Sequence, residues 1–293
     1  MKKFTKTLCA LAVAAGSLLA STAGHASVVV SYGGQAATDG SGLTSVYVPA
    51  DNKVLSTNFT KYFIETFDTA TRMFSDVGGG PLASTPLTSS ISGISISGAG
   101  CGFNANGKVP VTTVNGGLGI QKGSSGAAAT PFGDTTCYGS APGQSAPGVA
   151  NVVNGLTPAK VKLNYFNLIH SPLVSAGSAV SYIGFYLGSI DDYNSIQLFS
   201  GGTQVADLSG SFLLGSNLAF KGAQNDQRAN IYVNLDISAD LNVDQIQFTS
   251  TGIAVEMDNV VVGIPEPESL ALMGLGLVAL AASRRRKTAK VAA

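Results

Sequence analysis

Between residues 27 and 263, hydrophobic residues occur in short runs of β-branched and aromatic side chains, separated by Gly-, Ser- and Asn-rich turns. In the run ANIYVNLD every second side chain from Ile231 to Leu235 is apolar. A period of two is typical of a strand with one buried face. We therefore predict strands over 28–32, 44–50, 61–67, 92–97, 159–169, 178–188, 194–201, 203–208, 229–236, 243–250 and 252–263.

Turn residues separate these predicted strands. Gly201-Gly202 lies between IQLFS and TQVADL and predicts a β-hairpin. Asp191-Asp192-Tyr193-Asn194 predicts another turn. No segment between 27 and 263 has the pattern of a convincing helix, so we predict an all-β ectodomain that forms a jelly-roll-like β-sandwich.

The first 26 residues form a separate segment. Lys2, Lys3 and Lys6 precede an apolar run from Leu8 to Ala20, and Gly24-His25-Ala26 offers small side chains at positions −3 and −1 of a cleavage site. This order predicts a secretory signal peptide over 1–26, with the mature chain starting at Ser27. The alternative is a retained membrane anchor, which the shortness of the apolar run disfavours.

The other end, residues 264–287, reads IPEPESLALMGLGLVALAASRRRK. Pro265-Glu266-Pro267 is followed by the apolar run from Leu270 to Ala282 and then by Arg284-Arg285-Arg286. The run has no polar face, and the arginines act as a stop-transfer signal that places the C-terminus in the cytoplasm. We therefore predict a short membrane helix at about 269–283.

This C-terminal order of elements resembles the PEP-CTERM sorting signal of Gram-negative bacteria. The resemblance rests on Pro265, Glu266, Pro267, the apolar run, and Arg284, Arg285 and Arg286. It implies that residues 264–293 are a sorting tail processed by an exosortase, a membrane-embedded cysteine transpeptidase. It also implies a transient inner-membrane intermediate, followed by delivery to the cell surface or to the extracellular matrix of a biofilm.

Residues 98–150 are rich in Gly, Ser, Ala and Pro, and we predict a long loop or a partly disordered insertion there. Cys101 and Cys137 are the only cysteines left once the signal peptide is removed. An even pair of cysteines in an exported protein favours a disulfide between Cys101 and Cys137. Free thiols or a shared metal ion are the alternatives.

Charge excludes one class of partner. The chain has 17 basic and 17 acidic residues, but many of the basic ones lie in the two end segments, so the ectodomain is mildly acidic. Nucleic-acid binding depends on clustered Lys and Arg, and we expect none.

Few residues offer catalytic chemistry. His170 is the only histidine after the signal peptide, no G-x-S-x-G motif is present, and no cluster of His and Cys predicts zinc. We therefore expect a non-enzymatic protein with no catalytic residues and no certain cofactor. A secreted hydrolase that uses carboxylates is an alternative.

Acidic residues suggest a cation instead. Glu65-Thr66-Phe67-Asp68 and Glu256-Met257-Asp258-Asn259 resemble the strands that bracket jelly-roll modules of carbohydrate-binding and surface proteins. In some of those families such residues hold a structural Ca²⁺, which implies Glu65, Asp68, Glu256 and Asp258 as candidate ligands. Asp191-Asp192 either binds a cation or only stabilises its turn.

Sugar binding requires an aromatic platform, and the chain has no Trp. Tyr182, Tyr186 and Tyr193 are the candidates for sugar contact, although alternate residues of such a strand face the core. We expect an exported surface or matrix protein with a structural or adhesive role. A module that binds carbohydrate or extracellular polysaccharide is the main alternative.

Overall fold

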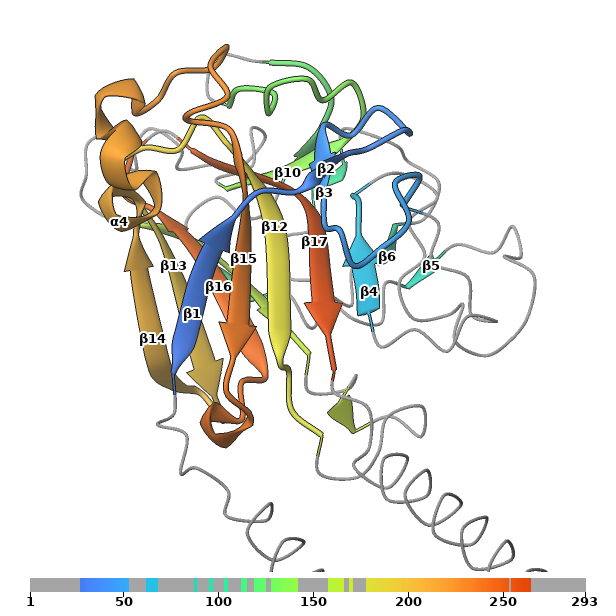
Figure 1. Ribbon diagram of the computed structural model, residues 1–293, viewed down its shortest axis with the longest axis vertical. Helices are drawn as coiled ribbons and strands as arrows, with labels where there is room; N and C mark the ends of the chain where they lie inside the picture. The colour runs from blue at the N-terminus through green and yellow to red at the C-terminus, as the bar shows by residue number, and fades with distance from the viewer. Residues whose placement is uncertain are drawn as a thin grey trace, which may run out of the picture.

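The computed structural model describes residues 27–52, 62–67, 87–88, 95–96, 103–104, 112–114, 119–124, 128–141, 158–165, 169–170, 178–252 and 254–264. Two antiparallel sheets lie one behind the other over these residues (Figure 1). The predicted all-β sandwich is thus confirmed. The predicted signal peptide and sorting tail lie outside the described residues.

The larger sheet has eight strands, with β17 near its centre. Its order is β1 (Val28–Tyr32), β15 (Ile231–Ile237), β12 (Tyr182–Gly188), β17 (Val255–Gly263), β10 (Tyr138–Ala141), β9 (Gly119–Gln121) and β7 (Phe103–Asn104), and β4 (Tyr62–Glu65) also pairs with β17. The first part of β17 pairs with β10 and the last part with β4. One long strand therefore joins segments from three distant parts of the sequence.

The smaller sheet has the order β14 (Thr203–Ser209), β13 (Asn194–Ser200), β16 (Gln245–Ser250), β11 (Ala159–Asn164) and β8 (Thr112–Val114). The predicted hairpin joins β13 to β14, and both turn glycines have positive φ (53° and 85°). Such angles favour glycine, which explains the Gly-Gly pair. Two short ribbons, β2 (Gln35–Ala36) with β3 (Leu43–Thr44) and β5 (Leu87–Thr88) with β6 (Ser95–Ile96), complete the strands.

The core lies between the two sheets. Val233 and Leu235 of β15 are completely buried in it, as the alternating pattern predicts. The rings of Phe185 on β12 and Phe248 on β16 meet edge to face, with centroids 5.3 Å apart, and join the two layers. Burying one such side chain stabilises the fold by roughly 1.5–3 kcal/mol.

A bulge interrupts β17 at Asn259. This residue has a φ of 47°, and the register with β12 shifts between Gly184 and Tyr186. Before the bulge, Val255 and Met257 belong to the core, so Glu256 and Asp258 face the outer side of the larger sheet. The extra residue then returns Val260 to the core.

The described residues include three short helical segments that were not predicted. They are α4 (Gly210–Leu214), η2 (Gly215–Phe220) and η3 (Ala239–Leu241). The Ser209 side chain accepts a hydrogen bond from the Phe212 backbone N–H and caps α4. A single helical turn is too short to produce a clear hydrophobic period, which is why the sequence pattern missed it.

Two predicted strands and the predicted loop differ from the structure. In 44–50 only Thr44 belongs to a strand. The strand predicted over 159–169 ends at Asn164, and the Ile169 backbone N–H donates to the Tyr165 carbonyl oxygen at 3.0 Å in a helical contact. The loop prediction over 98–150 is wrong for β7, β8, β9 and β10, which all belong to the two sheets, and the residues of β10 are buried and pair with β17. Tyr138 packs with Ala128 and Ala254, and Ala141 belongs to the core, so low hydrophobicity did not mean exposure.

Within the described part of the chain, no helix is long and apolar enough to cross a membrane. The predicted membrane helix at about 269–283 lies outside that part and stays a prediction.

Candidate functional site

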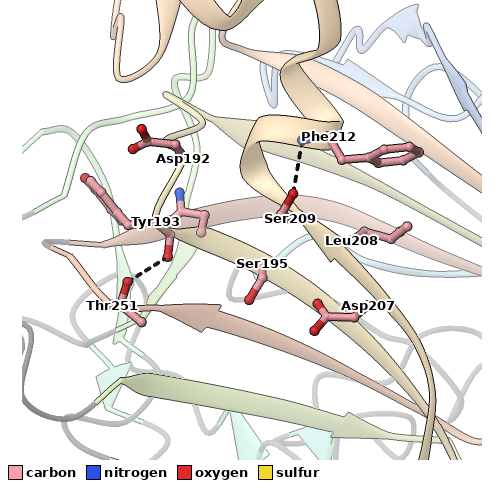
Figure 2. A pocket seen from close by; sticks show the side chains of 9 residues that line it. Asp192, Tyr193, Ser195, Asp207, Leu208, Ser209, Phe212 and Thr251 are labelled. Atoms are coloured by element: carbon pink, nitrogen blue, oxygen red, sulfur yellow. Dashed lines mark hydrogen bonds between the residues drawn. The ribbon is translucent and has the colours of Figure 1, made fainter.

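An open groove of about 580 Å³ lies over one end of the smaller sheet (Figure 2). It is formed by the turn before β13, the last residues of β14, helix α4 and the residue after β16. Strands β14, β13 and β16 are neighbours in the sheet, so the three strand ends meet at one place. The lining residues are Asp192, Tyr193, Asn194, Ser195, Asp207, Leu208, Ser209, Phe212 and Thr251.

Tyr193 forms one end of the groove lining, and two contacts hold its segment in place. Its carbonyl oxygen accepts hydrogen bonds from the backbone N–H and the hydroxyl of Thr251, both at 3.2 Å. Its ring lies directly over Gly252, where a β-carbon would come within 2.5 Å of the ring carbons. The tyrosine is therefore a partly exposed aromatic surface whose position depends on a glycine beside it.

Phe212 lies at the other end of the lining (Figure 2). Helix α4 carries it, and its side chain is 54% exposed although it is large and apolar. The Ser209 cap fixes the first turn of α4, and the Tyr32 hydroxyl donates to the Phe212 carbonyl oxygen at 3.4 Å. An exposed ring on an anchored turn offers an apolar surface to a ligand.

Between the two aromatic residues lies a polar network. Gln197 donates to Ser195 Oγ at 2.7 Å and to Asp207 Oδ1 at 3.2 Å. Thr249 and Gln247 both donate to Gln197 Oε1. The network orients Ser195 and Asp207 from beneath, so a hydroxyl acceptor and a carboxylate acceptor lie in fixed positions within the groove.

Charge at the rim comes from an exposed ion pair. Lys221 Nζ lies 2.6 Å from Asp192 Oδ2, and both side chains are largely exposed. The hydrogen bond from Lys221 holds the pKa of Asp192 below its ordinary value. A general acid needs the opposite shift, so Asp192 has the character of a hydrogen-bond acceptor.

Of the predicted sugar contacts, only Tyr193 lies in the groove. Tyr182 and Tyr186 are 3% and 1% exposed, which excludes a role in surface contact. The Tyr182 hydroxyl bonds to Ser45 and Asn234, and the Tyr186 hydroxyl donates to the Phe132 carbonyl oxygen. Both tyrosines lie on the outer face of the larger sheet, where loops cover them.

The predicted calcium ligands are not brought together as a set. Glu65 is paired with Val260 and faces the core, whereas Glu256 and Asp258 face the outer side of the sheet. Asp68 lies outside the described residues. Among the residues that the structure describes, no three His, Cys, Asp or Glu side chains form a metal-binding group. The predicted Ca²⁺ site of these four residues therefore stays a prediction, and the positions of Glu65, Glu256 and Asp258 do not support it.

Glu256 has a different environment from a calcium ligand. One carboxylate oxygen accepts from the Ala129 backbone N–H at 3.0 Å and the other from the Ser189 hydroxyl at 3.1 Å. Burial raises the pKa of Glu256 to about 8. The residue lies away from the groove, on the outer face of the other sheet.

The remaining predicted positions lie in a turn, at the surface and in the core. Asp191 and Asp192 form a turn in which the Asp191 carbonyl accepts from the Asn194 backbone N–H at 3.2 Å. His170 is exposed. Cys137 is buried and disulfide-bonded, while Cys101 lies outside the described residues, so the Cys101–Cys137 pairing stays a prediction.

Sequence reasoning missed Asp207, Ser195, Ser209 and Phe212. The only available signal was the Ser209-Gly210-Ser211-Phe212 sequence, in which a serine precedes a helix start. Nothing in the sequence showed that α4 and the turn at Asp192 would lie on the same end of one sheet.

Comparison with known families identifies the C-terminal segment. Residues 263–287 match the PEP-CTERM protein-sorting motif. The chain therefore carries the predicted sorting signal, which marks an exported protein for exosortase-dependent sorting to the cell surface. The comparison with curated proteins gave no match.

Proposed function

We propose that the ectodomain is a non-enzymatic adhesive module of the cell surface or extracellular matrix, which binds polysaccharide in the groove between Tyr193 and Phe212. The observation that carries this proposal is the composition of the groove, in which two partly exposed aromatic residues flank oriented hydroxyl and carboxylate groups. Sugars present apolar C–H faces and many hydroxyls, and this lining offers partners for both.

The destination supports the same ligand class. The sorting motif delivers the chain to the cell surface, where polysaccharide is an abundant polymer. An open groove accepts an internal segment of a long chain, whereas an enclosed cavity accepts only small molecules. Asp207 and Ser195 would accept hydrogen bonds from sugar hydroxyls, and the rings would cover a sugar face.

The absence of an enzymatic role is part of the proposal. Hydrolysis of a glycoside needs one carboxyl group with a raised pKa and a second carboxylate opposite it. Within the groove, the pKa of Asp192 is lowered by Lys221. Glu256 has the raised pKa, but it is buried on the other sheet.

The test measures binding of the full-length chain, purified in mild detergent, to the extracellular polysaccharide of its own host. We expect Phe212→Ala and Asp207→Asn each to weaken binding at least fivefold. Leu218→Ala is the control for Phe212→Ala, because Leu218 is also exposed but lies outside the groove. Equal binding by all variants would refute the groove, and release of new reducing ends from the polysaccharide would refute the non-enzymatic role.

A further inference from the structure

Two buried carboxylates meet beneath the loops that cover the outer face of the larger sheet. Asp258 on β17 is completely buried, and Asp134 is 7% exposed. Their side chains lie within hydrogen-bonding range of each other. Two like charges at that distance in a low-dielectric interior repel strongly, so the pair needs either a bound cation or a shared proton.

The two carboxylate oxygens of Asp134 have different surroundings. Its Oδ1 accepts from the Thr136 backbone N–H at 2.7 Å and from the Thr136 hydroxyl at 2.8 Å, while its buried Oδ2 has no donor. Among the described residues, no lysine or arginine forms an ion pair with the Asp134 carboxylate. Asp39 adds a second negative charge nearby, and burial raises the pKa of Asp134.

A neutral buried oxygen lies in the same cluster. Asn52 is 8% exposed, and its amide nitrogen donates to Asp39 Oδ2, Ser41 Oγ and Asn259 Oδ1. Its own Oδ1 is buried and accepts no hydrogen bond. Both acceptors lie next to the carboxylate pair. Ser41 forms a β-bridge with Asp134, and Asn259 directly follows Asp258 in the chain. The hydrogen bonds of Asn52 to Ser41 and Asn259 therefore place it beside both aspartates.

We propose that Asp134, Asp258 and the Asn52 side-chain oxygen bind one Ca²⁺ beneath the segment 39–52. All three ligand atoms are oxygens, which suit a hard cation and not zinc or copper. Two carboxylates match the charge of Ca²⁺, and water would complete its six to eight ligands. Of these donors only Asp258 was among the ligands predicted from sequence.

The bound ion would join three parts of the chain. Segment 39–52 contributes Asn52, segment 128–137 contributes Asp134, and β17 contributes Asp258. Extracellular modules of this kind bind Ca²⁺ with Kd values of roughly 10⁻⁴–10⁻³ M. The site lies on the larger sheet and the groove on the smaller one, so each proposal stands or fails alone.

Terbium luminescence tests the site directly. Tb³⁺ replaces Ca²⁺ and emits when a nearby tyrosine is excited, and Tyr186 lies close enough to both carboxylates for their charges to raise its pKa. The full-length chain, purified in detergent and freed of metal by a chelator, should give Tb³⁺ emission that Ca²⁺ displaces. Its Tm should also rise with Ca²⁺ concentration.

Asp134→Asn should weaken Ca²⁺ binding at least tenfold, while the Thr136 hydrogen bonds can remain. Asp240→Asn is the matched control, because Asp240 is exposed in η3, and it should bind as the wild type does. The proposal is overturned if the wild-type protein shows neither Tb³⁺ emission nor a Ca²⁺-dependent Tm. It is also overturned if its Tm rises only on acidification, because the two carboxylates then share a proton. The wild-type titration decides between these outcomes even if Asp134→Asn does not fold.

Discussion

The side-chain amide of Asn259 donates a hydrogen bond to the backbone carbonyl oxygen of Ser41 at 3.0 Å, across 218 positions of sequence. The same amide nitrogen donates to Ser41 Oγ and to the Leu43 carbonyl oxygen, and its oxygen accepts from Asn52. The bulge in β17 therefore anchors the segment 39–52 on the outer face of the larger sheet.

Asn259→Ala should lower the free energy of unfolding by roughly 2–4 kcal/mol. The change removes buried hydrogen bonds and leaves the carbonyl oxygens of Ser41 and Leu43 without this donor. It also places alanine at a φ of 47°, a left-handed conformation that asparagine adopts more readily than alanine. Urea unfolding followed by circular dichroism measures the loss.

Asn242→Ala is the control for Asn259→Ala. Asn242 has the same φ of 47° but is exposed, and its side-chain nitrogen donates to the Asp240 carbonyl oxygen at 3.3 Å. It carries the backbone strain without the buried network. Equal losses in the two variants would show that the Ser41 contacts contribute nothing to stability.

Because the pKa of buried Glu256 is raised, we expect an unusual dependence of stability on pH. Its pKa is raised from 4.5 to about 8 in the folded protein because burial disfavours the charged form. A raised carboxyl pKa means that the unfolded state loses its proton first as pH rises. The free energy of unfolding should therefore fall between about pH 4.5 and pH 8, by roughly 5 kcal/mol from this group.

Glu256→Gln should remove that part of the pH dependence. A glutamine oxygen can still accept from the Ala129 N–H, and its amide can donate to Ser189 Oγ. We expect the variant to match the wild type at pH 5 and to be more stable at pH 8. Urea unfolding at both pH values measures the difference, and a parallel decline in both proteins would assign the pH dependence to other groups.

The buried face of a strand could be predicted where apolar and polar residues alternate along it. The loops that cover the outer face of the sheet could not be predicted. The apolar positions of β15 lie in the core as their period of two indicates. Tyr182 belongs to a second small cluster with Val48, Ile64 and Val261, on the outer face. Val48 is 134 positions away in sequence, and no local pattern shows that it covers this tyrosine.

The groove was unpredictable for a similar reason. Tyr193 was one of the aromatic residues predicted to contact sugar, and it is partly exposed in the structure. Phe212 and Asp207 reach the same groove only because the hairpin places β14 beside β13 and α4 follows directly. Strand pairing decides that arrangement, and pairing depends on register between distant residues.

Substitution at the sorting motif should stop processing without changing the fold. Glu266→Ala alters the centre of Pro265-Glu266-Pro267, within the matched residues 263–287, so the exported chain should keep its full mass and fail to reach the surface normally. Glu268→Ala, two residues further on, is the matched control and should be processed. Mass spectrometry of the surface and membrane fractions of the native host gives the answer. Unchanged processing of Glu266→Ala would contradict a role for this glutamate in sorting.

Gly252 should control the position of Tyr193 in the groove. In Gly252→Ala the new β-carbon would lie within 2.5 Å of the ring carbons, so the ring must move. If the ring covers a sugar, we expect the affinity for polysaccharide to fall several-fold in Gly252→Ala and in Tyr193→Ala. The double variant should bind no more weakly than Tyr193→Ala, because both changes act on one side chain. Additive losses in a depletion assay would mean instead that Gly252 acts through a part of the groove other than Tyr193.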